Sequence, residues 1–221
     1  MKVLKRTWAD ISLDNLEHNY RTLREHVGKG PRFLGVVKAD SYGHGAVQVS
    51  RTLEELGAEY LAVSNLEEAI QLRRGGVGLP VLILGYTPPE YAPDEAEMSI
   101  TQEVHGLQYA KDLNKALEGT GRKLTVHLKI DTGMGRYGFL PDELDQLLPI
   151  FRYMPGLHVT GIYTHLHSAF CSQKATIAQA EAFQRVLDQL HASGCETGMA
   201  HMLNSAGLLK YPQYAMDGVR V

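Results

Sequence analysis

The sequence has few cysteines, no long apolar run and little net charge. Two cysteines, Cys171 and Cys195, occur among 221 residues; this is too few for a disulfide framework and fits a reducing compartment, with one structural bridge left open. The longest apolar runs are a few residues, far short of the roughly 18 needed for a membrane span. The basic start Met1–Trp8 lacks the apolar stretch of a signal peptide. We predict a cytoplasmic protein with no membrane segment.

The charge balance excludes another class of partner. The 22 Lys and Arg against 25 Asp and Glu give a net charge of −3, so nothing indicates binding to nucleic acid. A hydrophobic fraction of 44% is ordinary for a globular protein and allows a sizeable core.

Short β-rich segments alternate with helical ones along the chain, which is typical of βαβ units and of parallel strand pairing. The eight predicted strands are Arg32–Ala39, Tyr60–Ser64, Val81–Gly85, Ser99–Glu103, Leu124–Ile130, Val159–His165, Met199–Asn204 and Met216–Val221. The predicted helices between them are Ala46–Leu56, Leu66–Arg74, Leu107–Leu117, Asp142–Phe151 and Ala175–Leu190. Tyr86–Met98 is Pro-rich and can hold only a short turn of helix. A further helix, Asn15–Val27, precedes the first strand, with Asp14 as its expected N-cap and Glu17 three residues on.

This order of elements predicts an α/β fold, a TIM (β/α)8 barrel. An open doubly wound sheet would more often show a Gly-rich dinucleotide turn early in the chain. No internal repeat or interdomain linker interrupts the pattern, so one barrel domain is expected over residues 1–221. The sequence stops at Val221, so the predicted barrel is truncated within strand eight.

Lys38 comes at the end of the first predicted strand, the end at which TIM barrels carry their active sites. It shares strand parity with Leu34 and Val36 and should therefore point into the barrel. Burial lowers the pKa of a lysine, and a neutral amine is what imine formation with an aldehyde needs. The alternative is a strand-end lysine that extends its ammonium to solvent.

Two other strand ends also carry polar side chains. Lys129 and Arg136 bracket a glycine-rich turn, and two cations near one pocket suggest an anion between them. Lys129 could instead pair with Asp131 or another carboxylate as part of the structure. Asn204–Gly207 follows strand seven, where TIM barrels commonly bind phosphate, although a small-residue helix cap explains that segment equally well.

His165 and His167 share one face of the sixth predicted strand and have a spacing that could bind metal. Further ligands would have to come from residues such as His44, Asp131, Cys171 and His201. No Cys-x-x-Cys or His-Glu-x-x-His pattern supports such a site, so we predict no metal. A hydrogen-bonded core histidine is the simpler interpretation of either residue.

Taken together, these segments resemble the alanine racemase family. The resemblance is carried by VVKADSYGHG at residues 36–45, HLKIDTGMGR at 127–136, YTH at 163–165, Asn204-Ser205 and DGVR at 217–220. It extends over essentially all 221 residues. It implies a barrel that carries pyridoxal 5'-phosphate.

The resemblance also implies catalytic roles. Lys38 would hold the cofactor as a Schiff base and act as one of two catalytic bases. Arg136 would bind the substrate carboxylate and the phenolic oxygen of the cofactor. Lys129 matches a position that is carbamylated in some members, where the modified side chain positions the arginine that matches Arg136; an unmodified lysine would repel it.

Five further assignments concern the cofactor. By the resemblance, Tyr42 and Ser205 would hold the phosphate and Asn204 would line the ring. His165 would hydrogen-bond Arg220, which faces the pyridine nitrogen. An arginine stays protonated and can only donate to that nitrogen, so the ring becomes a weaker electron sink than with a carboxylate partner. Reprotonation at Cα, and hence racemisation rather than transamination, is then favoured.

The implied function is a two-base racemase that interconverts L- and D-alanine. In the family the second base is a tyrosine on a C-terminal β-domain that reaches in from the partner subunit, so a homodimer is expected. Neither that domain nor the phosphate-binding glycine loop after strand eight lies within this sequence. We therefore expect a piece of a longer racemase, with weak cofactor affinity and little activity on its own.

Three alternatives remain at this point. The first is a serine racemase of the same family. The second is a non-catalytic barrel similar to the pyridoxal-phosphate homeostasis proteins, which have a single domain. The third is a metal-dependent hydrolase that uses His165 and His167.

Overall fold

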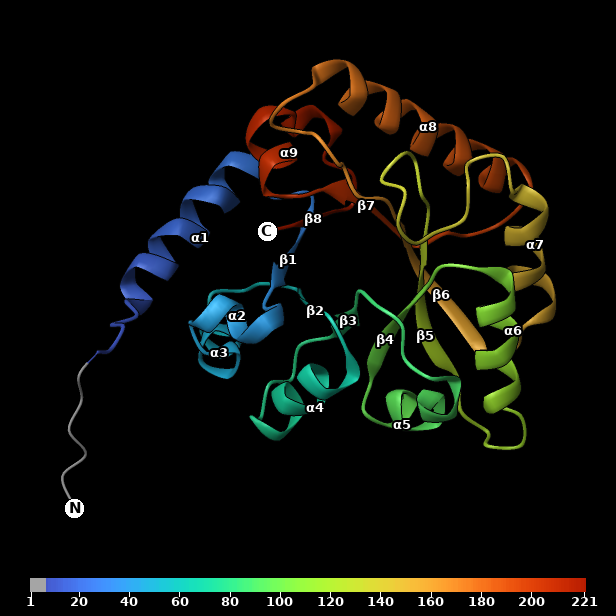
Figure 1. Cartoon of the computed structure of the whole chain (residues 1–221), viewed down its shortest axis with the longest axis horizontal. Helices are drawn as coiled ribbons and strands as arrows, with labels where there is room; N and C mark the ends of the chain where they lie inside the picture. The colour runs from blue at the N-terminus through green and yellow to red at the C-terminus, as the bar shows by residue number, and fades with distance from the viewer. Residues whose placement is uncertain (1–6) are drawn as a thin grey trace.

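The computed structural model describes residues 7–221. Residues 1–6, which make up most of the basic start, lie outside the described residues. Eight parallel strands close into a barrel in chain order (Figure 1). They are β1 (Arg32–Val36), β2 (Tyr60–Val63), β3 (Val81–Ile83), β4 (Ile100–Val104), β5 (Leu124–Lys129), β6 (Leu157–Tyr163), β7 (Met199–Leu203) and β8 (Gly218–Arg220). Because β8 pairs with both β7 and β1, the sheet has no free edge. The predicted TIM barrel is confirmed.

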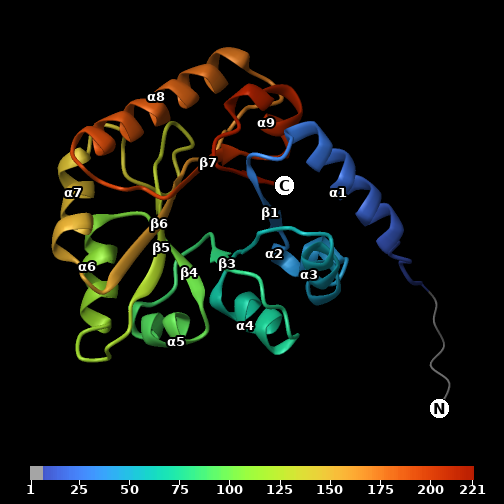
Figure 2. The same cartoon turned by 180° about the vertical axis from the view of Figure 1, so that it is seen from behind.

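Helices surround the strands on the outside of the barrel, as the view from behind also shows (Figure 2). They are α1 (Leu13–Val27), α2 (Lys38–Gly43), α3 (Ala46–Glu55), α4 (Leu66–Arg74), α5 (Ala92–Glu97), α6 (Leu107–Ala116), α7 (Leu144–Tyr153), α8 (Gln173–Ala192) and α9 (Ser205–Lys210), with single 3-10 turns η1 (Pro89–Tyr91) and η2 (Pro212–Tyr214). The C-terminal end of α1 reaches α9, where the His26 ring lies 3.1 Å from the Leu208 carbonyl oxygen. None of the described helices is long and apolar enough to cross a bilayer.

The local sequence explains why α4 forms where it does. Asn65 caps its N-terminus, because the Asn65 side chain accepts a hydrogen bond from the Glu68 N–H. Leu66, Ala69 and Leu72 are buried on one face, which is the helical spacing of an apolar stripe. Acidic residues in the first turn and basic residues in the last turn complement the helix dipole.

The barrel interior is divided between apolar and polar side chains. A small apolar cluster fills part of it and consists of Leu34, Tyr60, Ala62, Leu82 and Met199. Another part holds buried polar side chains, which include His127, Lys129, His201 and Arg220. Buried polar groups need hydrogen-bond partners, so this half of the interior is built around specific contacts.

Several predicted boundaries differ from the structure. The first strand ends at Val36 rather than Ala39, and Lys38 begins α2, which was not predicted. The predicted N-cap Asp14 is wrong: Ser12 caps α1, with its hydroxyl accepting from the Asn15 N–H at 3.2 Å, and Glu17 instead pairs with Arg21.

Other predictions hold, with shifts at the ends. The short helical turn in Tyr86–Met98 is present as η1 and α5. Strand eight is Gly218–Arg220, inside the predicted Met216–Val221. Cys171 is exposed and Cys195 buried, and both are free, so they form no bridge.

Candidate functional site

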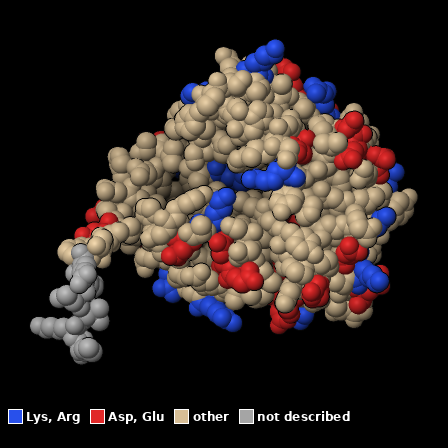
Figure 3. Space-filling model, viewed as in Figure 1, with Lys and Arg blue, Asp and Glu red and all other residues tan. Residues whose placement is uncertain are grey.

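A pocket of about 590 Å³ opens at the C-terminal ends of the strands. All seven residues predicted to be catalytic or cofactor-binding line it, namely Lys38, Tyr42, Arg136, His165, Asn204, Ser205 and Arg220. They come from five different βα segments, and the barrel topology brings them together. Lys and Arg side chains gather in a central hollow of the face shown in Figure 3. Among the described residues that line this pocket there is no Asp or Glu.

Lys38 reaches the pocket from a turn that sequence reasoning missed. Four consecutive non-glycine residues, Ala39 to Tyr42, have φ between 51° and 56° and form a left-handed turn, a conformation that L-residues avoid. Lys38 precedes this turn and Tyr42 ends it, and both side chains line the pocket. Lys38 is half-buried, so it neither sits inside the strand nor extends freely into solvent.

Arg220 is buried and held by several acceptors. Its guanidinium donates to the Thr164 carbonyl oxygen at 2.8 Å and to His201 Nδ1 at 2.7 Å. His165 Nδ1 lies 3.5 Å from Nη2 of the same guanidinium. Burial, with a smaller effect of Arg136, lowers the pKa of Arg220 to about 10. Arg220 therefore remains a cation at neutral pH.

The contact between Arg220 and His201 continues through the barrel to a second histidine. His201 Nε2 lies 3.1 Å from Nδ1 of His127. Because an arginine can only donate, His201 Nδ1 must accept, which leaves its Nε2–H to donate to His127. Burial first, and Arg220 second, lower the pKa of His127 to about 3 and that of His201 well below its ordinary value. Both rings are therefore neutral, with fixed tautomers.

Tyr163 packs at the centre of these side chains, and the sequence analysis gave it no role. Its ring stacks on His201 at 4.9 Å between centroids and lies 4.9 Å from the Arg220 guanidinium carbon. Its hydroxyl donates a hydrogen bond to the buried carboxylate of Glu103. Burial, together with Glu103, raises the pKa of Tyr163. The tyrosine in YTH and the acidic end of strand four were the only sequence signals for this pair.

Lys129 is buried and does not line the pocket. Its side chain is 1% exposed, and its amine donates to the Ile130 carbonyl oxygen at 2.8 Å. Burial, and secondarily Arg220, lower the pKa of Lys129 to about 8. No salt bridge joins it to Asp131 within the described part of the chain. No other carboxylate of the described residues forms a salt bridge with Lys129 either, so the alternative of an ion pair with Asp131 or another carboxylate is wrong.

Asp131 instead shapes the glycine-rich loop that presents Arg136. Its carboxylate accepts hydrogen bonds from the N–H groups of Gly133, Gly135 and Arg136 at 3.0–3.1 Å. Burial would raise the pKa of Asp131, but these three donors outweigh it and lower that pKa. The exposed Arg136 side chain is thus carried on an anchored loop.

Asn204 has the capping role that the sequence left open, and it also lines the pocket. Its Oδ1 accepts from the Gly207 N–H at 2.9 Å, and its Nδ2 donates to the Leu166 carbonyl oxygen at 3.1 Å. Ser205, the first residue of α9, is exposed at the pocket. Asn204 therefore caps α9 and also forms part of the pocket wall.

The proposed histidine pair does not converge. β6 ends at Tyr163, so His165 and His167 lie beyond the strand rather than on one strand face. His165 lines the pocket, and burial followed by Arg220 lowers its pKa to about 3. His167 is exposed and lies 2.5 Å from the Ser168 hydroxyl. The prediction that these histidines share a strand face is wrong.

The further metal ligands named from the sequence do not form a metal-binding group among residues 7–221. No group of three or more His, Cys, Asp or Glu side chains that could hold a metal occurs there. His44, one of the further ligands considered, turns its Nδ1 to the Ser41 carbonyl oxygen at 2.7 Å.

Comparison with known proteins identifies the family. The family model for alanine racemase, N-terminal domain, matches residues 11–221. The chain belongs to this alanine racemase family. Alanine racemase of Desulforamulus reducens is 42% identical over 216 residues, which cover 96% of this chain and 58% of that protein. The chain thus spans less than two thirds of the length of the relatives it matches.

Solved structures of racemases also match over nearly the whole chain. The alanine racemase of Clostridium difficile 630 in complex with cycloserine has a TM-score of 0.95 at 36% identity, over 99% of this chain and 61% of that chain. A histidine racemase from Leuconostoc mesenteroides has a TM-score of 0.86 at 27% identity, over 94% of this chain and 56% of that chain. Alanine racemase folds thus extend to proteins named for a different amino acid.

Proposed function

We propose that this chain supplies the cofactor pocket of a pyridoxal-phosphate-dependent alanine racemase. The observation that carries the proposal is the convergence of seven side chains on one pocket, with one amine, two guanidinium groups and no carboxylate in its described lining. Such a donor set fits a ligand that has an aldehyde, a phosphate and a phenolic oxygen. The names of the relatives support alanine as the substrate.

The family resemblance gives each of these side chains a task, and its presence in the pocket lining supports that task. Lys38 holds the cofactor through its amine and moves the Cα proton on one face of the substrate. Arg136 binds the substrate carboxylate. When bound, pyridoxal phosphate withdraws electrons from Cα and so makes the Cα proton acidic.

The remaining side chains orient the cofactor. Tyr42 and Ser205 bind its phosphate through their hydroxyls, and Asn204 lines its ring. Arg220 donates a hydrogen bond to the ring nitrogen and remains charged, and His165 lies beside Arg220 to support its orientation. The second proton-transferring group and the homodimer remain predictions from the family resemblance, and the cytoplasmic location remains a prediction from the composition of the sequence.

We also propose that Lys129 is carbamylated. Its buried amine, with a pKa of about 8, is partly neutral near neutral pH and can add to carbon dioxide with loss of one proton. The resulting carbamate would replace a cation near Arg136 by an anion that attracts it. Carbon-13 bicarbonate should then give a carbamate signal by NMR that Lys129→Arg abolishes; no such signal in the unsubstituted protein would contradict the modification.

The other functions considered are less well supported. The matching relatives are named racemases, which does not favour a non-catalytic homeostasis barrel. His165 and His167 point to different surroundings, which disfavours a metal-dependent hydrolase. A serine preference has no specific observation in its favour.

Racemisation of L-alanine by the full-length protein tests the proposal. We expect D-alanine to form, and Lys38→Arg to lower kcat by at least about 100-fold, because it removes a positioned general base. Lys111→Arg, on the exposed face of α6, is the matched control and should leave kcat unchanged. Equal kcat values for the two variants would contradict the role of Lys38.

A further inference from the structure

The left-handed turn that follows Lys38 needs an external restraint. Ala39, Asp40, Ser41 and Tyr42 all adopt positive φ, which L-residues disfavour, so the turn persists only if its surroundings hold it. Part of the restraint is local: Asp40 Oδ1 accepts from the Ala46 N–H at 2.7 Å, and the Ser41 N–H donates to the Val37 carbonyl oxygen. Among the described residues, one side chain from outside this segment also hydrogen-bonds to the backbone of the turn.

That contact is Glu68 on α4. Its Oε1 accepts a hydrogen bond from the Ala39 N–H at 2.8 Å, and its Oε2 accepts from the Ser64 N–H at 2.7 Å. Ala39 is the first residue of the left-handed turn, and Ser64 lines the candidate cofactor pocket. One carboxylate therefore ties the β1–α2 junction to the end of β2.

The environment of Glu68 suits this task. It is the third residue of α4, where a capping box would return its side chain to the N-cap Asn65. The side chain binds the two neighbouring N–H groups instead. No Lys or Arg of the described residues lies within salt-bridge distance of it, so the two N–H donors and the N-terminus of α4 stabilise its charge.

We propose that Glu68 is a positioning residue for Lys38. By fixing the Ala39 N–H it holds the left-handed turn, and the turn in turn keeps the Lys38 amine and the Tyr42 hydroxyl on the pocket side. The inference rests on the proposed function in that the pocket is taken to bind pyridoxal phosphate. Glu68 itself does not line the pocket as described.

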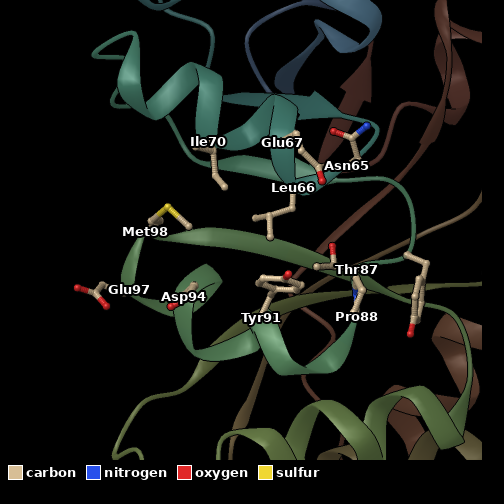
Figure 4. A pocket seen from close by; sticks show the side chains of 11 residues that line it. Asn65, Leu66, Glu67, Ile70, Thr87, Pro88, Tyr91, Asp94, Glu97 and Met98 are labelled. Atoms are coloured by element: carbon tan, nitrogen blue, oxygen red, sulfur yellow. The ribbon is translucent and has the colours of Figure 1, made fainter.

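The test compares Glu68→Gln with Glu67→Gln. Glu67 is exposed on the same turn of α4 and lines a separate hollow of about 720 Å³ between α4 and α5 (Figure 4). Both substitutions remove one negative charge, but only the amide introduced by Glu68→Gln would face two N–H donors with a single acceptor oxygen. Because a lost charge-assisted hydrogen bond corresponds to roughly tenfold or more, we expect Glu68→Gln to raise the Kd for pyridoxal phosphate about tenfold and Glu67→Gln to leave it unchanged.

A rescue experiment separates positioning from general stability. Glycine adopts positive φ without steric cost, so Ala39→Gly in the Glu68→Gln background should restore most of the affinity although it does not restore the carboxylate. A loss of affinity that Ala39→Gly does not reverse, or equal Kd values for Glu67→Gln and Glu68→Gln, would overturn the proposal. If Glu68→Gln does not fold, Glu68→Asp, which keeps the charge but is shorter, is measured in the same way with the same criteria.

Amide hydrogen exchange gives a readout that needs no cofactor. Without pyridoxal phosphate, the Ala39 and Ser64 amides should exchange faster in Glu68→Gln than in Glu67→Gln. If exchange accelerates but the unsubstituted protein binds no pyridoxal phosphate, the proposed function fails and the restraint stands. If the unsubstituted protein binds the cofactor but exchange is unchanged, the role of Glu68 fails alone.

Discussion

Single residues in this barrel differ in how well their buried charge is compensated. Arg220 is buried, and its guanidinium hydrogen-bonds to carbonyl oxygens and to a neutral histidine. Glu95 on α5 is also buried, but neither carboxylate oxygen has a hydrogen-bond partner within the described structure. Burying a charge without a partner is costly, so the two residues should respond differently to pH and to substitution.

Glu95 should make stability depend on pH. Burial, which outweighs the smaller effects of its neighbours, raises its pKa from 4.5 to about 7. Because the pKa is raised in the folded state, protonated Glu95 contributes stability that is fully present below a pH of about 4.5. This contribution is lost as the pH rises through about 7. Glu95→Gln should therefore increase the free energy of unfolding at pH 8 by up to roughly 3 kcal/mol, and by little at low pH.

Urea unfolding at pH 8 and at low pH measures this effect. Glu90→Gln, at an exposed position in η1, serves as the control and should change neither value. A Glu95→Gln protein whose stability gain is the same at both pH values would show that ionisation of Glu95 is not involved.

Arg220 should govern the outcome of the reaction rather than the fold alone. A carboxylate at this position would stabilise a proton on the ring nitrogen, and the ring would then accept more electron density. Arg220→Glu should therefore increase transamination products relative to racemisation. Product analysis by chromatography checks this, and an unchanged product ratio would count against the role of Arg220.

At the scale of elements, amphipathic helices were predictable and local backbone geometry was not. The predicted Leu66–Arg74 is α4 itself, because its apolar stripe and end charges agree with one another. The left-handed turn of α2 has no such signal, since none of its four strained residues is glycine. Ser12 and Asp14 are both suitable N-caps, and only the backbone conformation selects Ser12.

The corrected N-cap can be tested directly. Ser12→Ala removes the acceptor for the Asn15 N–H and should reduce the free energy of unfolding by about 1 kcal/mol. Asp14→Ala removes only a favourable charge in the first turn and should cost about half as much. Chemical denaturation of both variants decides between the caps; a larger loss with Asp14→Ala would restore the original assignment.

At the scale of the whole molecule, barrel closure assembles the pocket. The strand-end rule for TIM barrels brought Lys38, Arg136 and Arg220 together from the sequence alone. The hydrogen bond between His127 and His201 inside the barrel was not predictable, because it depends on strand register. Both His127 and His201 lie at register irregularities, on β5 and β7 respectively.

Gly161 on β6 provides the space for the His127 ring. A Cβ added to Gly161 would lie 2.5 Å from the His127 ring, so the ring would have to move within a closed barrel. Gly161→Ala should destabilise the protein by roughly 1–3 kcal/mol through overpacking and change the imidazole nitrogen shifts of His127 and His201. Thermal unfolding and nitrogen-15 NMR measure the two effects, and unchanged shifts would contradict the described contact.

The central claim is that the Lys38 amine holds pyridoxal phosphate in the pocket at the C-terminal end of the barrel. Borohydride reduction of the protein with bound cofactor, followed by peptide mapping, tests it most directly. We expect one reduced pyridoxyl-phosphate adduct, on Lys38, with loss of the visible absorption of the cofactor. Adducts spread over surface lysines, or none on Lys38, would contradict it.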